Sequence, residues 1–274
     1  MTGKLIKYEF KSIMKIMGIV WAALLASSLL TGISNSGFVS NIAESGEIGV
    51  INIFSSLSTF IYGGTVMALV AVTIVVIIAR FYKGLLGDEG YLMHTLPVKT
   101  WQLITAKGVT AAIVSLLSIA AGVVSGIIIG SFFDIWEMGD FARGFFRLLG
   151  DNPQYILIGV ELFVFAIVAI MSTVYKVYAS MAIGQLAQKN RILFSVLAYM
   201  GIGALGTALG TIFLSVSGDA FGSIFESVSN WMMDKEIHEI TQLAFLMAIV
   251  FEFIKLAIFH VVTERILTKR LNLE

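Results

Sequence analysis

Six stretches of the sequence are long and apolar enough to cross a lipid bilayer as helices. The hydrocarbon core of a bilayer is about 30 Å thick, so a crossing helix needs about 20 consecutive, mostly apolar residues. No stretch alternates with the period of two that the strands of a membrane barrel require. The sequence therefore predicts an all-α, polytopic membrane protein with six transmembrane helices, formed by residues 1–274 as a single domain. The six predicted spans are residues 16–33, 57–81, 108–133, 155–175, 192–216 and 240–262.

The composition supports a membrane protein over a water-soluble one. The chain is 58% hydrophobic and 13% charged, with a mean hydropathy of +0.92, whereas a soluble domain is about 25% charged. A chain this apolar has too few polar residues to coat a soluble core. It also contains no cysteine, which excludes disulfides, thiol nucleophiles and cysteine-ligated metal sites.

The distribution of basic residues predicts the orientation of the spans. Connections on the cytoplasmic side of a membrane carry an excess of Lys and Arg. Fourteen of the 18 Lys and Arg residues fall in the N-terminal segment, in residues 80–107 and 176–191, and in the C-terminal tail. The other three connections contain only Arg143, Arg147 and Lys235. Both termini are therefore expected in the cytoplasm.

The first 15 residues have a pattern of their own. Lys4, Lys7, Lys11 and Lys15 recur at spacings of three and four, which places them on one face of a helix. This pattern predicts an amphipathic helix at the cytoplasmic membrane surface, with its lysines toward anionic lipid headgroups. The alternative is that these lysines only fix the orientation of the first span.

The sequence lacks the motifs of common active sites. It contains no phosphate-binding loop of the G-x-x-x-x-G-K-[ST] type, no H-E-x-x-H and no G-x-S-x-G. His94, His238 and His260 are too widely spaced to suggest a metal site. We therefore expect no catalytic residues, no metal site and no cofactor site in this chain, and no basic tract with aromatic residues suggests nucleic-acid binding.

Three ionisable residues lie inside predicted spans, namely Glu161, Glu252 and Lys255. Such residues are costly in lipid, which makes each of them a candidate for function. Glu252 and Lys255 are three residues apart and can pair on one helical face. Two interpretations stay open at this point: a structural ion pair, or a role in a substrate path or in ion coupling.

Glycines recur every four residues in two of the spans. Small residues at this spacing let helices approach closely, most often within one chain and sometimes between subunits. The glycines predicted to pack helices are Gly122, Gly126, Gly130, Gly206 and Gly210.

A compact polar segment, residues 88–97, separates two of the longest apolar stretches. Asp88 and Glu89 suit the positive end of a helix dipole, and Pro97 ends the helix because the residue before a proline disfavours helical backbone. An apolar ridge is expected along this short helix, formed by Leu92, Met93 and Leu96. The segment suits the groove of a partner protein, and the alternative is a loop held on the membrane surface without a partner.

The stretch FYKGLLGDEGYLMHTLPVKTWQLITAKG resembles the first cytoplasmic loop of ABC-2-type ABC transporter permeases of Gram-positive bacteria, such as those that export bacitracin or phenol-soluble modulins. The opening KLIKYEFK is also similar to the N-terminus of that family. The six-span plan, with both ends inside, agrees along the whole chain. The residues that carry the loop resemblance are Glu89, Gly90, Tyr91, Leu92, Leu96, Pro97, Val98 and Lys107.

The resemblance implies that this loop is a coupling helix, which docks on a separate ATP-binding subunit and transmits its motion to the spans. Two permease chains, identical or related, would assemble with two copies of that subunit, which binds ATP and Mg²⁺. The path would lie between the permeases, lined by the second and fifth spans. The chain itself would be a non-enzymatic, multi-pass subunit in the bacterial cell membrane. The coupling residues would be Asp88, Glu89, Gly90, Tyr91, Leu92, Met93, Leu96 and Pro97.

For the substrate, the resemblance points to amphipathic or hydrophobic peptides of the antimicrobial or cytolytic class, exported from the cell or from the membrane. Export of drugs, lipids or sodium is an alternative within the same family. An ion-coupled secondary transporter or channel that uses Glu161, Glu252 and Lys255 is a different class of function. A membrane anchor or sensor without transport is a third.

Overall fold

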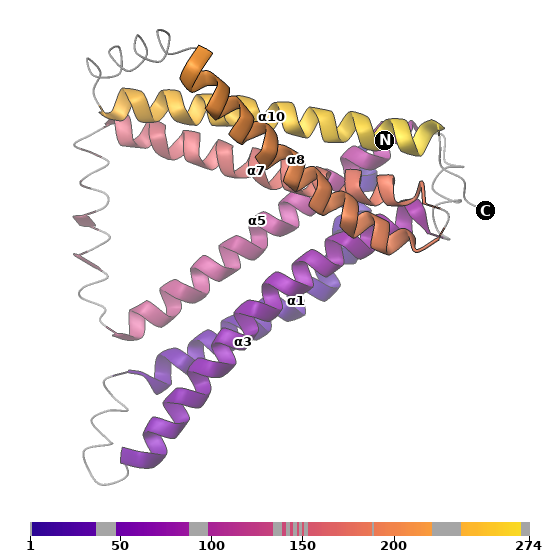
Figure 1. Cartoon of the computed structure of the whole chain (residues 1–274). Helices are drawn as coiled ribbons and strands as arrows, with labels where there is room; N and C mark the ends of the chain where they lie inside the picture. The colour runs from indigo at the N-terminus through magenta and orange to yellow at the C-terminus, as the bar shows by residue number, and fades with distance from the viewer. Residues whose placement is uncertain are drawn as a thin grey trace. The chain divides into compact units, whose positions relative to one another are not determined.

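The structure is a computed structural model, and all regular structure in its described residues is helical (Figure 1). The described residues contain six helices that are long and apolar enough to span a membrane. The predicted all-α class with six candidate spans is therefore confirmed. The structure describes residues 2–36, 48–87, 98–133, 139–140, 143–144, 147, 150, 153–187, 189–220 and 237–269.

Each predicted span lies inside one helix, and every helix is longer than the apolar stretch that predicted it. A short π-helix, η1, continues α3 without a break. The helices are α1 (Thr2–Ser34), α3 (Ile48–Phe81), η1 (Tyr82–Leu86), α5 (Thr100–Phe133), α7 (Pro153–Gly184), α8 (Arg191–Ala220) and α10 (Ile237–Lys269).

The end of α7 shows why the helices exceed the predicted spans. Residues 176–184 were expected in a polar connection because of Lys176, but they form the last turns of α7. Tyr178, Ala179 and Ala182 are almost fully buried there. Packing against neighbouring protein, rather than hydropathy alone, thus continues the helix.

The N-terminal segment is also part of a longer helix than the sequence predicted. Residues 2–15 and the predicted span 16–33 form one continuous helix, α1, with no loop between them. The placement of residues 1–15 along the membrane surface stays a prediction, and it would require α1 to bend near Lys15.

The chain packs as two compact units. The first comprises Met1–Arg80 and Val109–Asp151, and the second comprises Phe81–Gly108 and Asn152–Glu274. The boundaries fall at the end of α3 and within α5, so η1 and the start of α5 belong with α7, α8 and α10. A membrane domain can contain more than one packing unit, and the single-domain assignment stays a prediction.

The first unit has an apolar core formed by α1, α3 and α5. Polar contacts run beside this core, and they join side chains of different helices. Trp21 Nε1 donates a hydrogen bond to Ser118 Oγ at 3.1 Å, and the Thr73 and Ser118 hydroxyls bond each other at 3.2 Å. Small hydroxyl residues thus replace part of the apolar contact between these helices, as is common in membrane proteins. The core residues are Ile13, Met17, Leu24, Leu69, Val76 and Val114.

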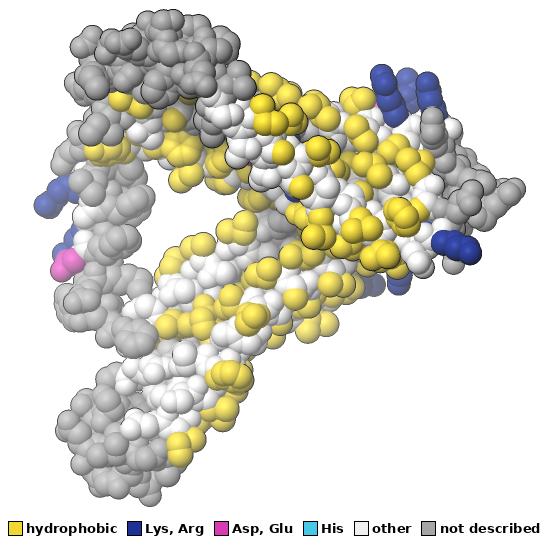
Figure 2. Space-filling view, in the orientation of Figure 1, with side chains coloured by type: hydrophobic (Ala, Val, Ile, Leu, Met, Phe, Trp, Pro, Cys, Tyr) yellow, Lys and Arg dark blue, Asp and Glu magenta, His cyan; other side chains and the backbone are white. Residues whose placement is uncertain are grey.

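In the second unit, α7 packs against both α10 and α8. The faces of the helices that point away from their neighbours are apolar, and Figure 2 shows hydrophobic side chains spread over them. Ile192 at the start of α8 is 69% exposed, and Leu205 farther along is 65% exposed. Lipid is the solvent that such faces favour.

Candidate functional site

The predicted coupling segment, residues 88–97, lies outside the described residues, and so do all eight of its predicted coupling residues. The structure does describe both of its flanks. The chain is described up to Gly87, at the end of η1, and again from Val98, just before α5. The contacts of these two flanks therefore define what the segment is attached to.

The first flank ends in an unusual helical turn. In η1 the Gly87 N–H donates to the carbonyl oxygen of Tyr82 at 2.8 Å, which is the five-residue spacing of a π-helix. Gly84, Leu85 and Leu86 of this turn are buried. Single π-turns are rare and occur frequently at functional sites.

An aromatic cluster joins the end of α3 to α7 and α10. The Phe81 and Tyr178 rings stack with centroids 3.8 Å apart and planes at 12°. Tyr175 meets Tyr178 edge-on at 5.9 Å, and it meets the His260 ring edge-on at 5.2 Å. We call Phe81, Tyr175, Tyr178 and His260 the aromatic cluster. Aromatic pairs in such geometries contribute about 0.5–1.5 kcal/mol each beyond their burial.

The second flank, the start of α5, meets the same cluster. The Tyr178 hydroxyl donates a long, 3.4 Å hydrogen bond to the Lys107 carbonyl oxygen. At Gly108 an added Cβ would lie 2.6 Å from Tyr175 Oη and 2.7 Å from Cζ. Only a glycine at this position leaves room for the Tyr175 ring against α5.

Lys107 connects the two flanks to each other. Its side chain is buried, with 7% of its surface exposed. At Gly84 an added Cβ would come within 2.6 Å of Lys107 Nζ, so the ammonium lies directly against η1. The resemblance places Lys107 at the opening of the next span, but in the structure it lies two turns inside α5. Lys107, Gly84, Gly108 and the aromatic cluster together form what we call the anchor of segment 88–97.

The pairing expected for Glu252 and Lys255 is present. Lys255 Nζ donates to Glu252 Oε1 at 2.5 Å, and the two residues lie three apart on α10. Both side chains are partly exposed, and Lys255 also lies 5.0 Å from the ring centroid of Phe251. The charge of each residue is thus largely balanced within α10 itself.

Glu161 is arranged differently. Its Oε2 atom is buried, and it has no hydrogen-bond partner in the described part of the chain. No ion pair or hydrogen bond among the described residues joins Glu161 to Glu252 or Lys255. The three charged candidates therefore do not form one contiguous site.

Four of the glycines with four-residue spacing have no close neighbour among the described residues. At Gly122, Gly126, Gly206 and Gly210 an added Cβ would meet nothing within 4 Å. The expected packing role of these glycines, within the chain or between subunits, stays a prediction. Spacing places glycines on one face, but it does not decide which face meets a neighbour. The glycines with close neighbours are Gly32, Gly84, Gly108 and Gly184.

The sequence interpretation also missed Lys176. The residue lies within α7, and its ammonium is 4.3 Å from the centroid of the Tyr199 ring on α8. An added Cβ at Gly203, one turn farther along α8, would be 3.4 Å from Lys176 Nζ. The apolar residues that follow Lys176 in the sequence were the available signal that the helix continues.

In comparisons with protein-family models, with curated proteins and with solved structures, no match to this chain is found. The features of the chain that bear on its function are therefore the anchor, the six apolar helices and the motif in the sequence.

Proposed function

We propose that this chain is the permease subunit of an ATP-driven exporter of the ABC-2 type. In this proposal residues 88–97 form a coupling helix that docks on a separate ATP-binding subunit. The observation that supports this best is the anchor: both flanks of the segment pack into one buried cluster. A loop that only connected two spans would not need to fix both of its ends to α7 and α10.

The anchor suits the transmission of motion. A displacement of residues 88–97 would act on η1 through Gly87 and on α5 through Thr100. From η1 it would pass through Phe81 to Tyr178 of α7, and from there through Tyr175 to His260 of α10. Closely packed aromatic rings are suited to this because packed interiors resist compression.

The working unit in this proposal contains two permease chains, identical or related, and two ATP-binding subunits in the bacterial cell membrane. Both termini of the chain lie in the cytoplasm. ATP and Mg²⁺ bind to the partner subunits, and this chain performs no chemistry. The substrate class is amphipathic or hydrophobic peptides, which is the class that the resemblance of the loop implies.

The decisive experiment asks whether an ATP-binding protein co-purifies with the chain. We expect co-purification, and we expect the ATPase activity of the reconstituted complex to rise when an amphipathic peptide is added. Reversing the charges of Asp88 and Glu89, together with Leu92→Ala, should abolish co-purification. The matched control reverses Asp134 and Glu137, which are predicted on the opposite membrane face. Intact assembly in the first variant would contradict the proposal.

A second variant separates docking from transmission. Tyr178→Leu removes the ring that stacks on Phe81, and it leaves residues 88–97 unchanged. We expect the ATP-binding subunit to bind normally while peptide-stimulated ATPase activity and peptide transport fall at least fivefold. The control is Phe165→Leu, which removes one ring of the edge-on pair with Phe245, 6.2 Å between centroids, away from the anchor. Equal losses in both variants would argue against a specific role for the anchor.

The ion-coupled alternative has less support because Lys255 already neutralises Glu252. It predicts transport by the purified chain alone when an ion gradient is applied. Such transport without an ATP-binding subunit would replace the proposal.

A further inference from the structure

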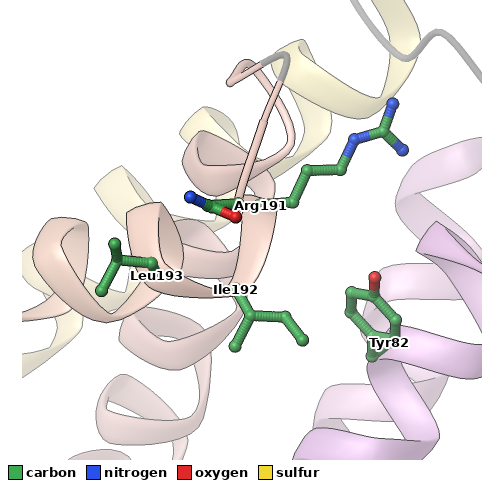
Figure 3. Close-up of a pocket in the computed structure, with 5 residues that line it drawn as sticks. Tyr82, Arg191, Ile192 and Leu193 are labelled. Carbon is green, nitrogen blue, oxygen red and sulfur yellow. The ribbon is translucent and has the colours of Figure 1, made fainter.

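An open pocket of about 740 Å³ lies between η1 and the beginning of α8, and its lining residues all belong to the second unit. It is lined by Tyr82, Asn190, Arg191, Ile192 and Leu193. In Figure 3 Tyr82 and Ile192 face each other across it, and the phenol oxygen lies on the same side as the Arg191 guanidinium. Neither the anchor nor the proposed coupling helix uses this pocket.

The polar side chains that line the pocket have no partner in the described part of the chain. Among the described residues, the side chains of Tyr82, Asn190 and Arg191 make no hydrogen bond or ion pair. Asn190 has a left-handed backbone, with φ 55°, a conformation that asparagine tolerates better than most residues. Its carbonyl oxygen accepts the Phe194 N–H at 3.1 Å, and its side-chain amide stays available. One cation and two neutral donors thus line the same open pocket.

The apolar side of the pocket opens onto a long apolar surface. Ile192 and Leu193 are 69% and 55% exposed. The exposed apolar surface continues along α8 with Phe194, Val196 and Leu197. A ligand that fits both sides has an anionic head and an apolar tail.

The level of the pocket favours a lipid over a soluble anion. It lies at the start of α8, where the apolar stretch 192–216 begins, so its polar side is expected at the membrane interface. Lys83 and Lys189 lie beside it in the sequence and are exposed. Basic pockets at this level bind the headgroups of anionic lipids.

We propose that this pocket binds the headgroup of an anionic phospholipid. The Arg191 guanidinium pairs with the phosphate, for which its planar fork is well suited. The Tyr82 hydroxyl and the Asn190 amide donate to the remaining phosphate oxygens, and an acyl chain follows Ile192 and Leu193. The lipid bridges η1 and α8. This inference does not depend on an ATP-binding partner or on which membrane face is cytoplasmic.

The test measures lipid binding to the purified full chain in a neutral detergent, with phosphatidylglycerol compared with phosphatidylcholine. We expect native mass spectrometry to detect a bound phosphatidylglycerol and the apparent melting temperature to rise only with that lipid. Arg191→Gln should weaken phosphatidylglycerol binding at least tenfold. The matched control is Arg265→Gln, which changes an exposed arginine of α10 that does not line the pocket. The affinity of this variant for phosphatidylglycerol should stay within twofold of that of the unchanged chain.

Tyr82→Phe keeps the test decisive if Arg191→Gln does not fold. It removes one hydroxyl and retains the ring, and we expect binding to weaken two- to fivefold. Equal stabilisation by phosphatidylcholine would overturn the inference, as would unchanged binding in both pocket variants. Equal stabilisation by glycerol phosphate or inorganic phosphate would also overturn it, because the site would then be one for a free anion.

Discussion

Gly184 shows how much a single residue decides where two helices meet. It is the last residue of α7, and the first turns of α8 fold back against it. An added Cβ would lie 2.7 Å from the Ser195 backbone nitrogen and 2.8 Å from the Arg191 carbonyl oxygen. Both are backbone atoms, so they cannot turn aside as a flexible side chain can.

We therefore expect Gly184→Ala to destabilise the chain. Overpacking of this kind costs about 1–3 kcal/mol, which should lower the melting temperature by several degrees in a fixed detergent. The matched control is Gly206→Ala in α8, where an added Cβ meets nothing within 4 Å. That variant should be neutral or slightly stabilised because alanine favours helix. Equal melting temperatures for the two variants would refute the close contact at Gly184.

The contact between Lys176 and Tyr199 can be tested as a single pair of residues. Its ammonium lies over the Tyr199 ring, and a cation–π contact contributes about 0.5–2 kcal/mol, depending on exposure. In a double-mutant cycle of Lys176→Gln and Tyr199→Leu, we expect a coupling free energy of unfolding in that range. The control cycle pairs Tyr199→Leu with Lys269→Gln at the end of α10, and it should be additive. Additivity in both cycles would contradict the contact.

At the scale of helices, the first unit is held together by hydroxyl contacts as well as by its apolar core. The Ser118 hydroxyl of α5 accepts a hydrogen bond from the Trp21 indole of α1, and it is also hydrogen-bonded to the Thr73 hydroxyl of α3. One side chain thus contacts two other helices. Tyr62 and Ser125 make a similar contact at 3.0 Å, two turns farther along α5.

Ser118→Ala should therefore loosen the packing of α1, α3 and α5. Interhelical hydrogen bonds in membrane proteins contribute about 0.6 kcal/mol on average and up to about 1.7 kcal/mol. Because two contacts are lost, we expect about 1–2 kcal/mol less stability in denaturant unfolding. The control is Ser131→Ala, because the Ser131 hydroxyl donates to the Ile128 carbonyl of its own helix. Equal stability of both variants would show that the interhelical contacts contribute little.

The sequence predicted the helices and the Glu252–Lys255 pair within α10, but it did not predict which residues join one helix to another. Long apolar stretches identify spans because lipid offers no hydrogen bonds. Every spanning segment must therefore satisfy its backbone N–H and C=O groups within its own helix. Contacts depend on the neighbouring helix, which is why Gly122 and Gly206 face open space while Gly108 and Gly184 do not. The aromatic cluster had no sequence signal, because Phe81, Tyr178 and His260 come together only through the fold.

For the whole molecule, helix length bears on how the chain sits in a membrane. The six candidate helices contain 30 to 34 residues, which corresponds to about 45–51 Å at 1.5 Å per residue. The hydrocarbon core is about 30 Å thick, so the helices must project beyond it or tilt. The basic residues of α1, α7 and α10 then reach the polar interface at the predicted cytoplasmic ends.

The orientation of the chain can be tested directly because it contains no cysteine. Single cysteines placed at Lys4, Lys189 and Gly150 can be labelled with a membrane-impermeant maleimide without background. If the basic residues set the topology, Gly150→Cys reacts in intact cells, and Lys4→Cys and Lys189→Cys react only after permeabilisation. All three positions are exposed, so failure to react cannot be attributed to burial in the chain. Labelling of Lys189→Cys in intact cells would reverse the predicted topology, and it would place the anchor on the wrong face for an ATP-binding partner.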